Sequence, residues 1–305
     1  MLDEETFDEQ ATAFPQLRPL YELNATLSKL RLTSLEIGSD NRNRCMLSAF
    51  GTVTGRNATS NSKLVFGPAR WIRGLIRPEP GHAIAYVDWA SQEVAIAAAL
   101  SGDEHLADAY RSGDAFARDA GLVPPDAIRA DYENVREVCK QIILGISYGM
   151  GAESLAFKAG ITVIEARELL RLHKVAYSKF WRWISETVDA ALFSGKIYSG
   201  FGWRRYVERE PNQRSLMNWP MQSTGSEMMR LAGIAATEAG IKVCCPIHDA
   251  FLIEAPANCI DDEVARMRAI MARAGMALTG GLEVRTDVNV VRAPARYMDK
   301  RGEDM

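Results

Sequence analysis

Two aspartates, Asp88 and Asp249, each stand where a strongly apolar, strand-like run breaks, one in the first third of the chain and one in the last. The first run, residues 83–87, reads AIAYV; the second, residues 244–247, reads CCPI, and AFLI follows Asp249. Short apolar runs bounded by polar residues are typical of buried β-strands. If both thirds contribute strands to one sheet, the two carboxylates can become neighbours and hold a hard divalent metal ion.

The sequence around Asp249 indicates a metal site more strongly than the sequence around Asp88 does. An aspartate at a strand end is commonly a turn former or a helix cap, and Asp88 alone is open to that interpretation. Asp249, between His248 and Ala250, interrupts two apolar runs at a spacing that fits a tight hairpin. A charge held between two buried strands needs a partner such as a metal ion.

A helical spacing of cations lies between the aspartates. Arg136, Lys140, Leu144 and Tyr148 recur at every fourth position, and Gly149 follows. Two cations one helical turn apart repel each other unless an anion lies between them or nearby glutamates neutralise them, and the spacing leaves both explanations open. Together with paired carboxylates, such a helix favours phosphoryl or nucleotidyl transfer.

Composition excludes several classes of protein. The chain has 305 residues, 47% of them hydrophobic, a net charge of −3, an acidic N-terminus and no apolar run of membrane-spanning length, so we expect a cytoplasmic protein with no membrane partner. Its five cysteines show no C-x-x-C spacing, which predicts reduced, mostly buried thiols rather than disulfides or a zinc site.

The apolar pattern predicts the order of the elements. We expect a helix from about residue 17 to 35, irregular structure from 45 to 80, a strand ending near Asp88, and a buried helix over residues 91–100. Residues 102–198 show helical spacing almost throughout. Strands are then predicted at 241–247, 251–255 and 282–290, with a helix at about 260–276 between the last two.

The local distribution of charge gives a weak indication of nucleic-acid binding. Residues 56–79 carry five basic residues against one acidic residue, and residues 196–214 interleave basic and aromatic side chains. Such stretches suit a phosphate backbone and stacked bases, although a run of cations is usually just a solvated face.

Several ordered motifs resemble the polymerase core of family A DNA polymerases, the bacterial DNA polymerase I type, and particularly the versions carried by phages. The resemblance begins at Thr54-Gly55-Arg56 and runs to the C-terminus. The matching blocks are residues 87–93 with 100–104, the helix of residues 136–150, residues 201–206, residues 218–224, and residues 247–249 with 254–256.

The resemblance implies an α+β fold with the right-hand architecture, an antiparallel palm sheet with packed helices and inserted helical fingers. The implied parts are an N-terminal segment and first part of the palm at 1–101, fingers at 102–198, and a second part of the palm at 199–305. The implied activity is DNA-directed DNA synthesis from dNTPs, in a bacterium or a bacterial host cell, with primer–template DNA and dNTPs as partners.

The resemblance also implies a role for each site residue. Two Mg²⁺ ions, with Mn²⁺ as a substitute, would bind Asp88, Asp249 and the backbone carbonyl of Trp89. The dNTP would contact Arg136, Lys140, Leu144, Tyr148 and Glu93, with Lys140 also the acid for pyrophosphate and Glu93 and Tyr148 excluding a ribose 2′-hydroxyl. The primer–template would contact Arg56, Arg204, Arg205, Asn218, Gln222 and His248.

The chain also departs from the family pattern. A second carboxylate that often follows Asp249 is Ala250 here, a triphosphate-binding histidine is Phe116, the base-packing aromatic is Leu144, and an arginine of the first motif is Ala95. Only about 55 residues precede Arg56, where the family carries a thumb and usually an exonuclease. We therefore keep three alternatives: a fragment or minimal enzyme whose thumb or exonuclease comes from another chain, a catalytically weak DNA-binding replication accessory, and a two-metal nuclease.

Overall fold

The computed structural model describes residues 4–29, 35–60, 62–67, 70–112, 145 and 149–298. The chain forms two compact units. The first comprises residues 1–49, 57–80 and 291–305, and the second comprises residues 50–56 and 81–290. The three-part division into palm and fingers expected from the sequence is not tested by these two units and stays a prediction.

The first unit is mainly helix and irregular chain. It contains α1 (Glu4–Ala13), a 3-10 turn (Pro15–Leu17), α2 (Arg18–Lys29) and a second 3-10 helix (Arg70–Leu75). The edge of Phe7 packs on Tyr21 with ring centroids 5.5 Å apart, which joins α1 to α2. The helix predicted from about residue 17 is confirmed as far as Lys29.

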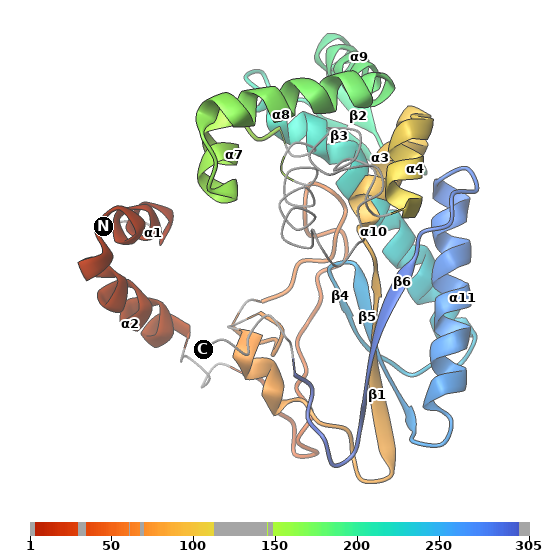
Figure 1. Cartoon of the computed structure of the whole chain (residues 1–305). Coiled ribbons are helices and arrows are strands. Elements are labelled where there is room, and N and C mark those ends of the chain that lie inside the picture. The colour runs from red at the N-terminus through yellow and green to blue at the C-terminus, as the bar shows by residue number, and fades with distance from the viewer. Residues whose placement is uncertain are drawn as a thin grey trace. The chain divides into compact units, whose positions relative to one another are not determined.

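A four-stranded sheet forms the centre of the second unit, in the order β4-β5-β1-β6 (Figure 1). The strands are β1 (His82–Trp89), β4 (Val243–Ile247), β5 (Ala250–Pro256) and β6 (Thr286–Arg292). β5 pairs antiparallel with both β1 and β4. All but the last residue of β5 are buried, because this strand has a neighbour on each edge and packed elements on its faces.

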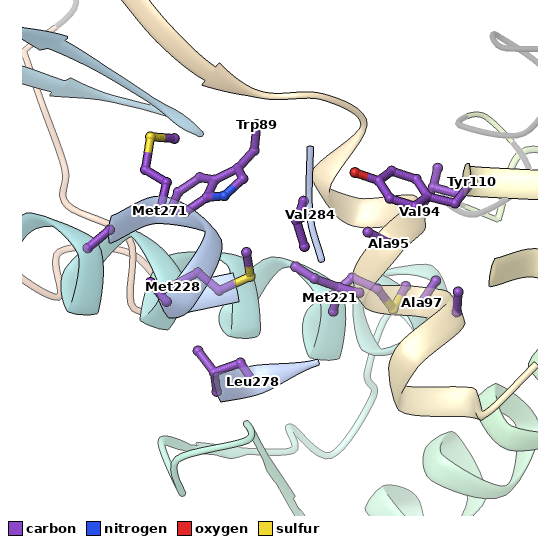
Figure 2. Packing of buried hydrophobic residues seen from close by; sticks show 14 of the residues in the cluster. Trp89, Val94, Ala95, Ala97, Tyr110, Met221, Met228, Met271, Leu278 and Val284 are labelled. Carbon is purple, nitrogen blue, oxygen red and sulfur yellow. The ribbon is translucent and has the colours of Figure 1, made fainter. Parts of the chain in front are cut away.

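Two long helices pack against this sheet and against each other: α10 (Gln213–Glu238) and α11 (Ile260–Leu278) (Figure 1). The short helix α3 (Gln92–Ser101) follows β1 almost directly and ends at Gly102, whose φ of 63° supplies the left-handed C-cap. Trp89 from β1, Val94 and Ala95 from α3, and Met228 from α10 belong to one buried cluster (Figure 2).

The described remainder of the middle third is helical. It contains α4 (Glu104–Ser112), α7 (Ala152–Ala159), α8 (Val163–Ala176) and α9 (Ser178–Ser194). Thr162 and Glu165 form a capping box at the start of α8. Asp103 caps α4 by accepting from Leu106 N at 3.1 Å, and its other oxygen accepts from Phe180 N of α9 at 3.0 Å.

Several sequence predictions need correction. The helical pattern expected to residue 198 gives way to strand β2 (Lys196–Tyr198), which pairs with β3 (Arg204–Tyr206). The last strand starts at Thr286 rather than at 282, and α10 was not predicted at all. The thiols of Cys45, Cys244, Cys245 and Cys259 are free as expected, but none of these four is buried.

Candidate active site

The sheet brings the two aspartates together at one end of adjacent strands. Asp88 on β1 is paired in register with Ala250, the first residue of β5, and the backbone N–H of Trp89 donates to the carbonyl of Asp249 at 3.1 Å. Both aspartates are half-buried. The sequence predicted that the two aspartates would be neighbours if their strands shared one sheet, and the structure has this arrangement.

Both aspartates adjoin a backbone of unusual conformation. His248 and Asp249 form the two-residue turn between β4 and β5, and His248 has a φ of 50°. Ser91, three residues after Asp88, has a φ of 51°. Non-glycine residues with left-handed backbone are uncommon and concentrate at functional sites, where surrounding contacts hold them.

Glu93 and Arg56 form an ion pair close to the aspartates. Nη2 of Arg56 lies 3.2 Å from Oε1 of Glu93, and the two side chains are 29% and 16% exposed. Burial raises the pKa of Glu93; the Arg56 guanidinium partly offsets this effect, and the charge of Asp249 adds to it. The charge of Asp249 therefore acts on the Glu93 carboxyl, although less strongly than burial and Arg56 do.

The donor set fits a hard divalent cation. Asp88, Asp249 and the Trp89 carbonyl offer oxygen atoms, which are the ligands that Mg²⁺ prefers, and the repulsion between Asp249 and Glu93 would be relieved by a cation. Within the described ranges, no three His, Cys, Asp or Glu side chains converge on a possible ion site. Mg²⁺ commonly takes only one or two carboxylates and completes its coordination with water and substrate phosphates.

Helix α10 holds the chain segment that carries Arg56. Trp219 Nε1 donates to Val53 O at 2.8 Å, Ser226 Oγ to Thr54 O at 2.9 Å, and Arg230 Nη2 to Gly55 O at 2.7 Å. We call residues 50–56 the strap. Gly55 has a φ of 76°, and a Cβ there would lie 3.2 Å from Ser226 Oγ, so glycine suits both the conformation and the space.

Sequence reasoning missed the anchoring residues Trp219, Ser226 and Arg230 because it missed α10. Pro220 and Gly225 inside the helix, together with a run of small polar residues, hide its apolar periodicity. One available signal was Asn212, whose side chain caps the helix by accepting from Ser215 N at 3.3 Å.

The predicted primer–template residues occupy three elements. Asn218 and Gln222 lie one turn apart on α10 and are partly buried, whereas His248 is exposed on the β4–β5 turn. Arg204 and Arg205 lie on β3. Arg205 Nη1 donates to Ser215 Oγ at 2.9 Å, and the Arg204 guanidinium lies 4.7 Å from the centroid of the Tyr206 ring.

The surface around β2 and β3 carries exposed aromatic rings. Tyr198, Phe201 and Tyr206 are all exposed, and Trp203 stacks on Phe50 of the strap with ring centroids 4.7 Å apart. This arrangement places aromatic and cationic groups together, as the sequence pattern indicated. The four residues of the predicted nucleotide helix, Arg136, Lys140, Leu144 and Tyr148, lie outside the described residues.

Comparison with known proteins identifies the family. The model of DNA polymerase family A matches residues 5–295 of this chain. The chain belongs to DNA polymerase family A. The family match begins well before Thr54, so it includes the N-terminal helices as well as the motifs.

Named relatives agree with this family. The chain is 29% identical to the thermostable DNA polymerase I of Thermus thermophilus over 73% of its own length, and 28% identical to DNA polymerase I of Chloroflexus aurantiacus over 91%. The aligned parts make up 29% and 33% of those two relatives, so the chain spans about a third of their length.

A solved structure supports the fold. The polymerase domain of Pol1 from M. smegmatis, in a complex with DNA primer–template and dNTP, matches 96% of this chain and 56% of that chain, with a TM-score of 0.78 and 22% sequence identity. The predicted α+β right-hand polymerase architecture is thereby confirmed. Across the parts of the chain that the structure describes, no helix is long and apolar enough to cross a membrane.

Proposed function

We propose that this chain carries out template-directed DNA synthesis, adding dNTPs to a primer 3′-hydroxyl with release of pyrophosphate. The observation that carries the proposal is the junction of β1 and β5, where Asp88 and Asp249 meet beside the Glu93–Arg56 pair. Membership of DNA polymerase family A supports this chemistry over other uses of paired carboxylates.

Asp88, Asp249 and the Trp89 carbonyl would hold two Mg²⁺ ions, which supply charge stabilisation and a more acidic primer hydroxyl. Side chains would bind the substrate and transfer the proton. Arg136 and Lys140 would bind the triphosphate, and Lys140 would give a proton to the leaving pyrophosphate. Tyr148 and Glu93 would exclude a 2′-hydroxyl from the sugar pocket, and Leu144 would border the sugar and base.

The strap supports a role for Arg56 at the primer terminus. Three hydrogen bonds from α10 hold its backbone, and the ion pair to Glu93 orients its guanidinium. Asn218 and Gln222 project from the same helix that holds the strap, so α10 would present several polar groups to the primer–template. His248, Arg204 and Arg205 would add contacts on neighbouring elements.

The proposal extends to a further partner. The chain spans about a third of the length of its named relatives. We propose that a separate chain supplying a thumb or an exonuclease would support its DNA synthesis. If such a partner supplies contacts to the duplex, these 305 residues tested alone should bind DNA weakly and in a salt-sensitive way, and their products should grow by a few nucleotides per encounter.

Primer extension with Mg²⁺ and dNTPs tests the proposal. Asp249→Asn should abolish extension and leave primer–template binding nearly unchanged, because it removes a metal ligand without changing the size of the side chain. Asp262→Asn, on the exposed start of α11, is the matched control and should extend like the parent chain.

Other outcomes distinguish the alternatives. Degradation of the primer would indicate a two-metal nuclease, and DNA binding without extension or degradation would indicate a replication accessory. Retention of the parent rate by Asp249→Asn would refute the two-metal assignment.

A further inference from the structure

Ala90, which follows the candidate metal site, is bound through both of its backbone groups. Ala90 N–H donates to the carbonyl of Arg285 at 2.8 Å, and Ala90 C=O accepts from the hydroxyl of Tyr110 at 3.1 Å. The Tyr110 hydroxyl in turn accepts from Arg285 N–H at 2.8 Å. Three residues from the β1–α3 turn, α4 and the chain before β6 thus form a closed ring of hydrogen bonds.

Tyr110 is held firmly in this ring. Its side chain belongs to the same buried cluster as Val94 and Val284, and the residue is 3% exposed (Figure 2). Arg285 Nη2 donates to the Tyr110 carbonyl at 2.7 Å, and the Arg285 guanidinium lies 4.8 Å from the centroid of the Tyr110 aromatic ring. Burial raises the pKa of the Tyr110 hydroxyl, so this group stays protonated and able to donate at neutral pH.

The ring of hydrogen bonds acts on the Trp89 carbonyl, because the peptide bond between Trp89 and Ala90 is planar. The N–H of Ala90 and the C=O of Trp89 belong to the same peptide unit, and in a trans peptide these two groups point in opposite directions. The bond from Ala90 N–H to Arg285 therefore turns the Trp89 carbonyl away from Arg285.

The other side of Trp89 is held as well. Its own N–H donates to Asp249 O at 3.1 Å, and its indole packs edge-on against Phe251 with ring centroids 6.2 Å apart. Ser91, next to Ala90, has its left-handed φ of 51° just where the ring constrains the chain. The Trp89 carbonyl is therefore restrained by one bond to its own peptide unit, through Ala90 N–H, and by one bond to the preceding unit, through Trp89 N–H.

We propose that Tyr110 is a positioning residue for divalent metal binding, because its hydroxyl and the Arg285 backbone hold Ala90 through the peptide units on its two sides and so aim the Trp89 carbonyl at the cation held by Asp88 and Asp249. The inference rests on the proposed polymerase site. Phenylalanine at position 110 could fill the same buried space but could bond neither Ala90 O nor Arg285 N.

A structural role alone has a different signature. If the hydroxyl only stabilised the fold, Tyr110→Phe would lower the unfolding temperature, while the folded fraction would bind metal as the parent does. A positioning role changes the metal affinity of the folded protein. The two roles separate when metal binding is measured well below the unfolding temperature.

The test measures Mn²⁺ binding to the full chain with primer–template, by the electron paramagnetic resonance signal of free Mn²⁺. Tyr110→Phe should weaken Mn²⁺ binding and raise the Mg²⁺ concentration for half-maximal single-turnover extension, each by about 3- to 10-fold, as expected for one lost hydrogen bond. Primer–template affinity should not change. Tyr177→Phe is the matched control, because Tyr177 is equally buried but lies between α8 and α9. Its metal affinity should equal that of the parent.

The outcomes separate this inference from the proposed function. If the parent chain extends no primer at any Mg²⁺ concentration, the proposed function is wrong, while the comparison of Mn²⁺ affinities still tests the positioning role of Tyr110. Equal Mn²⁺ affinity in Tyr110→Phe and the parent would overturn that role. Should Tyr110→Phe not fold, Arg285→Gln decides, because it removes the guanidinium contacts that hold the Tyr110 carbonyl and aromatic ring, and so releases the hydroxyl from its fixed position at Ala90 O. This variant should weaken Mn²⁺ binding by about two-fold or more, and an unchanged affinity would overturn the inference.

Discussion

Arg230 offers a direct test of how the strap is held. Its guanidinium donates to Gly55 O at 2.7 Å and lies 3.6 Å from the centroid of the Phe50 ring. A hydrogen bond with a charged partner contributes about 1.5–3 kcal/mol and a partly exposed cation–π contact about 0.5–1 kcal/mol. Burial lowers the pKa of Arg230, with a partial offset from Glu227, which shows that placing the charge there has a cost. We therefore expect Arg230→Met to destabilise the docked strap by about 1–3 kcal/mol.

This loss of free energy shifts the equilibrium between the docked and the detached strap, because the strap is a short segment that can detach while the core stays folded. Since about 1.4 kcal/mol is tenfold in an equilibrium constant, the open population should rise about 5- to 150-fold. The Thr52 and Gly55 amides, which donate to Arg56 O and Thr52 O, should lose protection in hydrogen exchange. Primer–template affinity should fall with them, because Arg56 loses its support.

A matched control separates strap release from general loss of charge. Arg273→Met changes an exposed arginine of α11 and should leave exchange at residues 50–56 unchanged. Arg230→Lys keeps the charge without the planar fork and should give an intermediate effect. Exchange rates in Arg230→Met within about two-fold of the parent would refute the reasoning, because a hydrogen bond of this kind cannot be lost at so small a cost.

Three further predictions concern other sites. Asp103→Ala should destabilise the second unit by about 2–4 kcal/mol in denaturant unfolding, since it removes the cap of α4 and leaves Phe180 N–H unsatisfied; a loss below about 0.5 kcal/mol would contradict this account. Burial raises the pKa of Glu93, so its contribution to stability is full below the ordinary glutamate pKa and is lost as pH rises through the raised value. Glu93→Gln should therefore gain stability relative to the parent as the pH rises from the ordinary glutamate pKa through the raised one, and parallel pH profiles of unfolding for the two proteins would show the reasoning to be wrong. Leu144→Tyr should narrow the discrimination between dNTPs and dideoxynucleotides in primer extension, while Leu144→Phe should change it little; equal discrimination in the parent and the Tyr variant would place Leu144 away from the sugar.

Local sequence was sufficient for the elements whose pattern is simple. The AIAYV run predicted β1, and the alanine-rich stretch after it predicted α3, because each buries nearly all of its residues and carries a continuous apolar signal. The hairpin around Asp249 followed from the two apolar runs that flank it. α10 was missed because the buried residues in the middle of the helix include Ser223, Thr224 and Gly225, which pack by being small rather than by being apolar. A Cβ on Gly225 would lie 2.8 Å from Gln92 Oε1, so only the approach of α3 explains that glycine.

The sequence by itself determined the family of this protein, because ordered motifs record residue types and spacing. It also determined that Asp88 and Asp249 lie close to strand ends. Only the tertiary structure decided that those strands are neighbours, that Arg56 pairs with Glu93, and that Tyr110 binds the carbonyl of Ala90, next to Trp89. The physical reason is that a strand-end carboxylate has the same local pattern whether it faces a partner or solvent. Pairing and hydrogen-bond geometry arise from segments far apart in the chain, which meet only when the sheet and α10 pack together.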